Sequence, residues 1–275
     1  MSYIDYIHAN AIRIGNERQE AFTVENVYGN KVNNLREIRN DLFQQRVDAL
    51  LGVPMTRQFV IDSFHQNLYF GYVTAMLWGG LGLTNWSHLM SAMTIAPDEV
   101  ENKLRNIKAL LRANQIQQAF MSLQISRDRV FPQNNKLVGV DISYFTKLLY
   151  FLYDGNSAVP PIIFDKWGTY FHAGLLISKN EIDQLISFYK MGYNEKGKFN
   201  ISIKSNRSTS YRYNVYADYM SKMAVLSSEL NLSSPDLLEE FLFGKELKPQ
   251  ENRNNANPRF FVRNYVTTFY NNEMR

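Results

Sequence analysis

The sequence predicts a mainly α-helical protein with one small β segment, and three observations support this class. Apolar residues recur at helical spacing over long stretches, most clearly in residues 97–123. The run Ser-Pro-Asp-Leu-Leu-Glu-Glu, which begins at Ser234, supplies a cap, a proline in the first turn and early acids for a further helix. In residues 198–204 apolar residues alternate instead, which indicates a short strand or hairpin.

Three helical regions are expected in the first half of the chain. Residues 33–51 have apolar residues at helical spacing with arginines between them, and Pro54 ends that pattern. Residues 57–83 indicate one or two mainly buried helices that end at Gly79-Gly80. Residues 97–123 are interpreted as a single amphipathic helix.

The central stretch, residues 137–167, combines a tight turn, an apolar helix, a loop and a buried segment. Gly139 allows a backbone turn that other residues resist. Residues 142–153 are too densely apolar for a surface helix, yet Lys147 lies in the middle of them. Asp165 follows an apolar run that should also be buried. A lysine and an aspartate in apolar surroundings need partners or a chemical role.

The last third of the chain is mostly helical in pattern. Helices are expected at residues 170–177, 181–189, 213–230, 234–243 and 259–269. Residues 190–213 differ, because basic residues are interleaved there with Tyr, Ser and Asn around a single acid, Glu195. Such a segment suits contacts to phosphates and stacked bases, and a solvated loop is the alternative.

Length and composition limit the possibilities further. A chain of 275 residues with 45% hydrophobic residues can bury a large core, as one sizeable domain or two interlocked ones. The formal net charge of +4 and the sequence pI of about 9.0 are compatible with nucleic acid as a partner. Most of the aromatic residues, 14% of the chain, are expected in the core.

The lack of cysteine excludes several classes of site. A chain with no cysteine has no disulfide framework, no cysteine-ligated zinc, no cysteine nucleophile and no cysteine-bound iron–sulfur cluster. The four histidines are scattered, so no metal or other cofactor is expected. The N-terminus has no export signal, and the most apolar run, residues 68–83, is short for a membrane span, so we expect a cytoplasmic protein.

The central stretch resembles a known superfamily. Leu-Val-Gly-Val-Asp, then Ser-Tyr-Phe-Thr-Lys-Leu-Leu and Pro-Ile-Ile-Phe-Asp-Lys-Trp-Gly, resemble the helix-hairpin-helix (HhH-GPD) DNA glycosylases, and most closely their bacterial 8-oxoguanine DNA glycosylase (OGG)-like proteins. Leu137, Gly139 and Val140 match the hairpin turn, and Asp165 matches the catalytic aspartate. Two further motifs resemble the bacterial subgroup: Thr-Lys-Leu-Leu at 146–149 and Trp-Gly-Gly at 78–80.

The turn also departs from the family pattern. Val138 stands where the family has proline, and Asp141 stands where it has its second glycine. A carboxylate there would repel the DNA phosphate that the turn normally binds. The lysine nucleophile of bifunctional members would fall at Ser143, whereas Lys147 lies one helical turn further on.

The resemblance implies a particular architecture. We expect one glycosylase-like unit over residues 1–275, built as two interlocked helical lobes with a cleft between them and the hairpin at its mouth. The approximate lobes are residues 1–60 with 168–275, and residues 61–167. The β insertion lies near 198–204.

The resemblance also implies an activity. We expect a monomeric DNA glycosylase that extrudes a modified base from double-stranded DNA and cleaves its N-glycosidic bond. The base would be an oxidised purine or, in antiphage defence, a bulky modified base of phage DNA. Asp165 would stabilise the positive charge that develops on the sugar.

Lys147 has three interpretations that the sequence leaves open. It could be an amine nucleophile, which would add lyase activity and would require a depressed pKa. It could be a cation that contacts the flipped base, a phosphate or Asp165. It could also be a snorkelling residue with no catalytic part.

Candidate binding residues complete the hypothesis. For DNA binding the candidates are Lys136, Gly139, Val140, Lys198, Lys204 and Arg207. For the base pocket they are Trp78, Phe164 and Trp167, chosen by position alone. Two other functions stay open: a non-catalytic DNA-binding protein that keeps the glycosylase fold, and a helical interaction protein unrelated to DNA.

Overall fold

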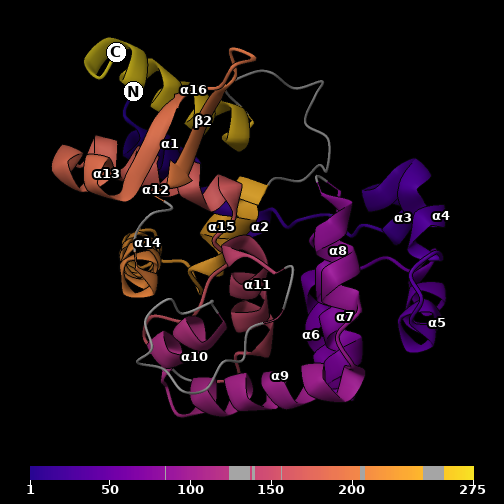
Figure 1. The fold of residues 1–275 in the computed structure, drawn as a ribbon. Helices are drawn as coiled ribbons and strands as arrows, with labels where there is room; N and C mark the ends of the chain where they lie inside the picture. The colour runs from indigo at the N-terminus through magenta and orange to yellow at the C-terminus, as the bar shows by residue number, and fades with distance from the viewer. Residues whose placement is uncertain (84, 124–136, 138–139, 156, 205–207, 244–256) are drawn as a thin grey trace. The chain divides into compact units, whose positions relative to one another are not determined.

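A computed structural model of the chain describes residues 1–83, 85–123, 137, 140–155, 157–204, 208–243 and 257–275 (Figure 1). The described residues are mainly helical, with a single two-stranded sheet, which confirms the predicted fold class. Among them, no helix is long and apolar enough to cross a membrane.

The elements of the first half of the chain are nearly all α-helices. They are α1 (Tyr3–Ala9), α2 (Ala11–Asn16), α3 (Val24–Tyr28), the 3₁₀ helix η1 (Gly29–Lys31), α4 (Val32–Leu35), α5 (Asp41–Leu50), α6 (Arg57–Gln66), α7 (Leu68–Trp78), α8 (Trp86–Met93), α9 (Pro97–Arg112) and α10 (Ile116–Leu123).

The second half adds the sheet and the remaining helices. They are α11 (Ile142–Leu152), α12 (Lys166–Ser178), α13 (Ile182–Phe188), β1 (Tyr189–Tyr193), β2 (Phe199–Ile203), α14 (Thr209–Glu229), α15 (Asp236–Phe243) and α16 (Pro258–Glu273).

The chain divides into two compact units. The terminal unit comprises Met1–Gln19 and Ile162–Arg275, and the central unit comprises Glu20–Pro161. The predicted lobes changed over near residues 60 and 167 instead, so the structure assigns residues 20–60 to the unit that also holds α11. Whether the two units act as one glycosylase stays a prediction.

The central unit is organised around α7. Every residue of α7 from Gly71 to Trp78 is buried, and the helix packs against α3, α5, α6, α9 and α11. Asn67 separates α6 from α7: it ends the first helix, and its side-chain oxygen caps the second by accepting from Phe70 N–H. The region therefore holds two helices, and the predicted burial is confirmed for α7, whereas α6 is buried on one face only.

The prediction of one helix over 97–123 is wrong. α9 ends at Arg112 and α10 begins at Ile116, and Asn114 between them has a φ of +56°. The N–H groups of Asn114 and Gln115 donate to the carbonyls of Leu111 and Leu110, which closes the end of α9. An asparagine tolerates this left-handed backbone, so the chain turns although its apolar periodicity continues.

The terminal unit is organised around α12. Its residues from Gly168 to Leu176 are buried, and the helix packs against α1, α13, α14, α15, α16 and β2. Gly174 permits close approach of the N-terminal helix, because a Cβ there would lie 2.7 Å from Tyr3 Cδ1.

The predicted β insertion is an antiparallel hairpin. β1 pairs with β2 so that Tyr189 lies opposite Ile203 and Tyr193 opposite Phe199. Phe199 and Ile201 alternate with exposed residues along β2, because both side chains are buried in the terminal unit. The preceding helix is shorter than predicted, because Tyr189 is already the first residue of β1.

Candidate active site

Asp165 is the N-cap of α12 in the terminal unit. Its Oδ1 accepts hydrogen bonds from the N–H groups of Trp167 at 2.7 Å and Gly168 at 3.1 Å. Thr169 Oγ1 donates to the Asp165 main-chain carbonyl at 3.0 Å. Among the described residues, none donates a hydrogen bond to Oδ2. One carboxylate oxygen is therefore held in place, and the other is available to a ligand.

Two tyrosines of α14 hold the segment that leads into Asp165. The hydroxyl of Tyr216 accepts from Ile162 N–H at 3.1 Å and donates to the Ile162 carbonyl at 2.9 Å. The hydroxyl of Tyr219 donates to the Ile163 carbonyl at 3.2 Å. These bonds satisfy the polar backbone of an extended, buried segment and fix the direction in which it enters α12.

Lys147 lies in α11 of the central unit and is only 3% exposed. Its ammonium Nζ donates to the main-chain oxygen of Ser143 at 3.1 Å and lies 5.1 Å from the ring centroid of Tyr144. The burial that the sequence predicted is confirmed. Asp165 and Lys147 belong to different units, so a catalytic pairing of the two stays a prediction.

The Trp-Gly-Gly motif makes room for Lys147. A Cβ at Gly79 would lie 3.1 Å from both Lys147 Cδ and Tyr144 Cε1, closer than most such contacts. Gly80 is needed for a different reason, because its φ of +69° is a left-handed conformation. Trp78 itself is 3% exposed and packs edge-on against Phe151.

The hairpin turn is only partly described, because Lys136 and Gly139 lie outside the described residues. Val140 N–H donates to the Leu137 carbonyl at 3.2 Å, so in this conformation that donor is already engaged. Asp141 caps α11 by accepting from Ser143 N–H and Oγ, both at 3.1 Å. A helix-capping role explains why a carboxylate occupies the position of the family's second glycine.

The other candidates are distributed over the terminal unit. Phe164 is 1% exposed and packs on the rings of Tyr216 and Tyr219, which is a core environment. Trp167 is half-buried in the first turn of α12. Lys198 is exposed just before β2, Lys204 follows that strand, and Arg207 lies outside the described residues.

The sequence did not indicate the buried arginine beside Trp167. The guanidinium of Arg259 in α16 lies 5.3 Å from the Trp167 ring centroid, and Nε donates to the Leu242 carbonyl at 3.1 Å. Burial lowers the pKa of Arg259, and the charges of Asp165 and Glu239 oppose that shift. The sequence did not indicate this buried position, because Arg259 lies in a run of mixed apolar and basic residues.

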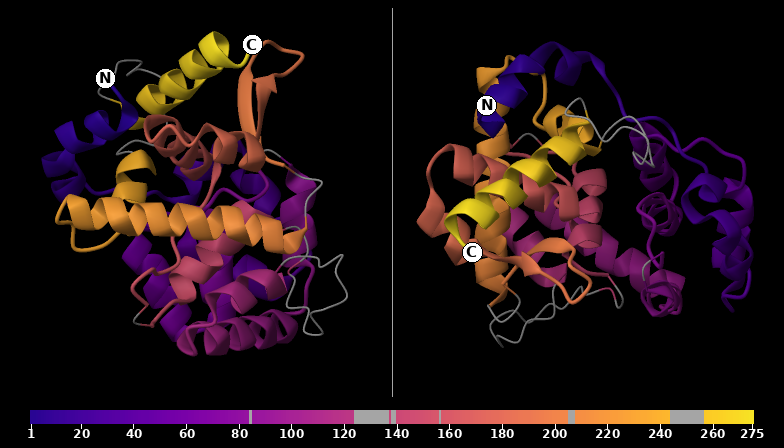
Figure 2. Two further views of the ribbon diagram at one scale, coloured as in Figure 1. Left: turned by 90° about the vertical axis from the view of Figure 1, so that its left-hand side faces the viewer. Right: turned by 90° about the horizontal axis from the view of Figure 1, so that it is seen from above.

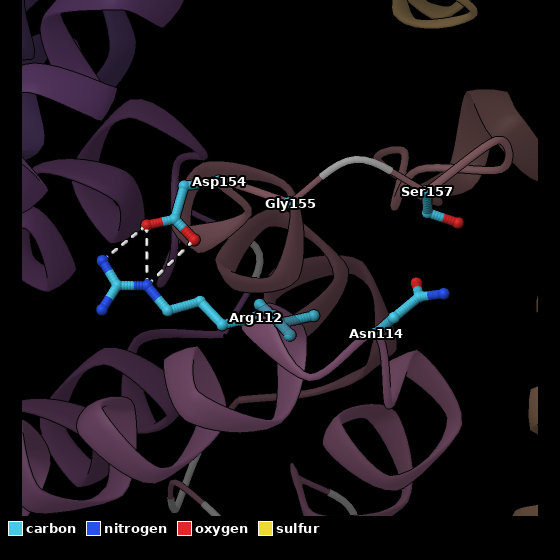
Figure 3. A pocket seen from close by; sticks show the side chains of 6 residues that line it. Arg112, Asn114, Asp154, Gly155 and Ser157 are labelled. Carbon is cyan, nitrogen blue, oxygen red and sulfur yellow. Dashed lines mark hydrogen bonds and ion pairs between the residues drawn. The ribbon is translucent and has the colours of Figure 1, made fainter.

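The central unit has a polar hollow that contains none of the predicted site residues (Figure 3). Its volume is about 530 Å³, and the described residues that line it are Leu111, Arg112, Asn114, Asp154, Gly155 and Ser157. Arg112 binds the Asp154 carboxylate through Nε and Nη2 at 2.8 to 3.2 Å and holds the pKa of that carboxyl below its usual value.

The described residues form a mainly helical chain of two units, in which Asp165 caps the buried helix α12. Residues 18–243 match the family described as "Putative 8-oxoguanine DNA glycosylase OGG-like protein". The chain belongs to this family, which confirms the resemblance. Searches of curated proteins and of solved structures found no match.

Proposed function

We propose that this protein is a DNA glycosylase that extrudes a modified base from duplex DNA and hydrolyses its N-glycosidic bond, leaving an abasic site. Family membership supports a glycosylase-like role. The observation that carries the proposal is the geometry of Asp165, whose Oδ1 is held by two backbone N–H groups while Oδ2 is available.

The chemistry requires such a carboxylate. As the bond to the base breaks, its electron pair leaves with the base and positive charge develops on the deoxyribose. A negative charge held in place beside that carbon stabilises the transition state without first having to reorient. Water then bonds to the sugar carbon, and Asp165 Oδ2 is the oxygen that would accept the water's proton.

Lys147 is proposed to act as a held cation rather than as the nucleophile. Its ammonium is buried and donates to Ser143 O in its own helix, which supports a fixed position for the charge. Sodium borohydride traps the imine that an amine nucleophile forms, so the wild type should give no trapped DNA adduct. An adduct that disappears in Lys147→Met would instead make Lys147 the nucleophile.

The substrate class proposed is an oxidised purine, with a bulky modified base of phage DNA as the alternative. A panel of duplexes that carry different modified bases, assayed for abasic sites, distinguishes the two. Asp165→Asn should lower base release by about 10²-fold or more and retain DNA binding, because the amide oxygen can still cap α12. Release by Asp165→Asn at the wild-type rate would contradict the proposal.

The second candidate is a DNA-binding protein that keeps the fold without catalysis. Two observations favour it: Asp141 caps α11 where a glycine would face phosphate, and Ser143 occupies the nucleophile position. Tight DNA binding with no base released from any duplex of the panel would support this candidate.

A further inference from the structure

A group of cations lies where three elements of the terminal unit meet. Lys166 is the first residue of α12, Lys198 directly precedes β2, and Arg263 belongs to α16. We call these three residues the basic cluster. Only Lys198 was expected from the sequence to contact DNA.

Trp167 lies against both Lys166 of α12 and Arg259 of α16. Lys166 Nζ lies 5.7 Å from the Trp167 ring centroid, and the guanidinium carbon of Arg259 lies 5.3 Å from the same centroid. Arg263 is one helical turn beyond Arg259 and therefore on the same face of α16. The two helices pack against each other.

Tyr170 and Phe199 bring in the hairpin. Tyr170, one turn after Lys166, donates its hydroxyl to the Phe199 carbonyl at 3.4 Å, and the two rings lie 6.4 Å apart. Phe199 also packs on Tyr270 of α16, with ring centroids 5.3 Å apart. Both views of Figure 2 show the orange hairpin beside the yellow α16. Lys198, next to Phe199, is thus held near the other two cations.

The cluster lacks acidic partners. Among the described residues, Lys166, Lys198 and Arg263 form no ion pair. Lys166 is only partly buried, and its pKa is lowered by this partial desolvation and then by the charges of Lys198 and Arg263; only Asp165 opposes the shift. Elsewhere in the same unit, Lys222 binds Asp218 and Glu181. Like charges held together are destabilising unless an anion joins them.

The charges around the cluster stay positive in sum. Among the described residues, the acids that act on Lys166 or Arg259 are Asp165 and the buried Glu239, and both act on Arg259. Arg259 balances one of these two negative charges. One acid is then left against the three cations of the basic cluster. Lys166 and Lys198 are exposed and Arg263 is half-buried, so an external anion can reach them.

We propose that Lys166, Lys198 and Arg263 form a binding site for the phosphate backbone of the DNA strand that passes Asp165. The proposal rests on the proposed function and adds to it a phosphodiester contact made by the terminal unit. A phosphate bound there would place the adjacent sugar near the available carboxylate oxygen of Asp165.

The experiment measures the affinity for duplex DNA against salt concentration. Lys166→Gln, Lys198→Gln and Arg263→Gln are compared singly and together, with Lys179→Gln as the matched control. Lys179 is the exposed residue that ends the same helix, about 20 Å from its start. Lys179→Gln makes the same charge change away from the cluster.

The triple variant should bind DNA about tenfold more weakly at low salt. The slope of log affinity against log salt should fall by about 1 for each phosphate that the variant no longer binds. The weakening should be equal on modified and unmodified duplexes, because phosphate contacts carry no sequence information. Lys166→Arg, which keeps the charge, should retain the wild-type slope.

A triple variant with the same salt slope as Lys179→Gln would overturn the cluster proposal. If that variant still released the base, the proposed glycosylase activity would stand without it. A wild-type protein that fails to bind DNA even at low salt would overturn both proposals.

Discussion

Asp165 combines a structural and a proposed chemical role in one side chain. Its Oδ1 caps α12, while Oδ2 is available for chemistry. The sequence indicated this residue through its place after an apolar run, but no local pattern showed the cap. Apolar periodicity predicted a helix from Tyr170, whereas α12 begins at Lys166 directly after Asp165.

The two roles of Asp165 can be separated by substitution. Asp165→Asn keeps an oxygen for the cap, so its free energy of unfolding should stay near the wild-type value while base release falls by about 10²-fold or more. Asp165→Ala removes the cap as well and should lower the free energy of unfolding by about 1 kcal/mol. Urea denaturation measures the free energy of unfolding of each variant, and a single-turnover assay measures its base release. Equal stability of the two variants would argue against the cap.

At the scale of elements, α6 and α7 meet at a glycine. A Cβ at Gly71 would lie 2.3 Å from Phe64 Cγ and 2.6 Å from Phe64 Cα, so the neighbouring backbone itself would have to move. Gly71→Ala should lower the free energy of unfolding by about 1 to 3 kcal/mol.

The matched control is Gly15→Ala in α2. A Cβ at Gly15 would meet nothing within 4 Å, so the higher helix propensity of alanine should raise the free energy of unfolding by up to about 1 kcal/mol. Urea denaturation compares the pair. If both substitutions changed the free energy of unfolding in the same direction, close packing at Gly71 would not explain the effect of Gly71→Ala.

The break between α9 and α10 is a second test at this scale. Asn114→Ala places an ordinary side chain at a φ of +56° and should cost about 1 kcal/mol, whereas Asn114→Gly should cost little. Thermal denaturation of the two variants measures the difference. An alanine variant as stable as the glycine variant would mean that the left-handed backbone at position 114 does not destabilise an ordinary side chain.

At the scale of the whole molecule, a buried network ties the terminal unit together. His172 of α12 is fully buried, with Nδ1 2.6 Å from the Tyr189 hydroxyl and Nε2 2.6 Å from Asp218 Oδ2. Lys222 joins Asp218 to Glu181. Helices α12 and α14, strand β1 and the loop before α13 are thus joined by one network of hydrogen bonds and ion pairs.

This network predicts acid sensitivity. Burial lowers the pKa of His172 despite the attraction of Asp218, so below the unfolded value of about 6.5 the unfolded chain binds the proton more readily. The free energy of unfolding should therefore fall as the pH drops from about 7 to about 5. The lowered pKa of Asp218 adds a further decrease at still lower pH.

Urea denaturation of the wild type and of His172→Asn at several pH values tests this sign. The variant should be less stable at about pH 7 and should show a flatter dependence between about pH 7 and about pH 5. Equal pH dependence in the two proteins would remove His172 as the cause.

The sequence by itself determined the helical class, the position of the β hairpin, the burial of Lys147 and the family motif around Asp165. These features depend on local periodicity and on residue types that few environments tolerate. It could not determine that Asn114 interrupts a continuous apolar face, because the left-handed turn costs little and leaves the periodicity intact.

Only the tertiary structure decided which side chains meet. Lys166, Lys198 and Arg263 are far apart in the chain, and the sequence indicated DNA contact for Lys198 alone. Packing of Trp167, Tyr170 and Phe199 brings them together. The position of a cation beside an acid depends on contacts between distant segments that no local pattern encodes.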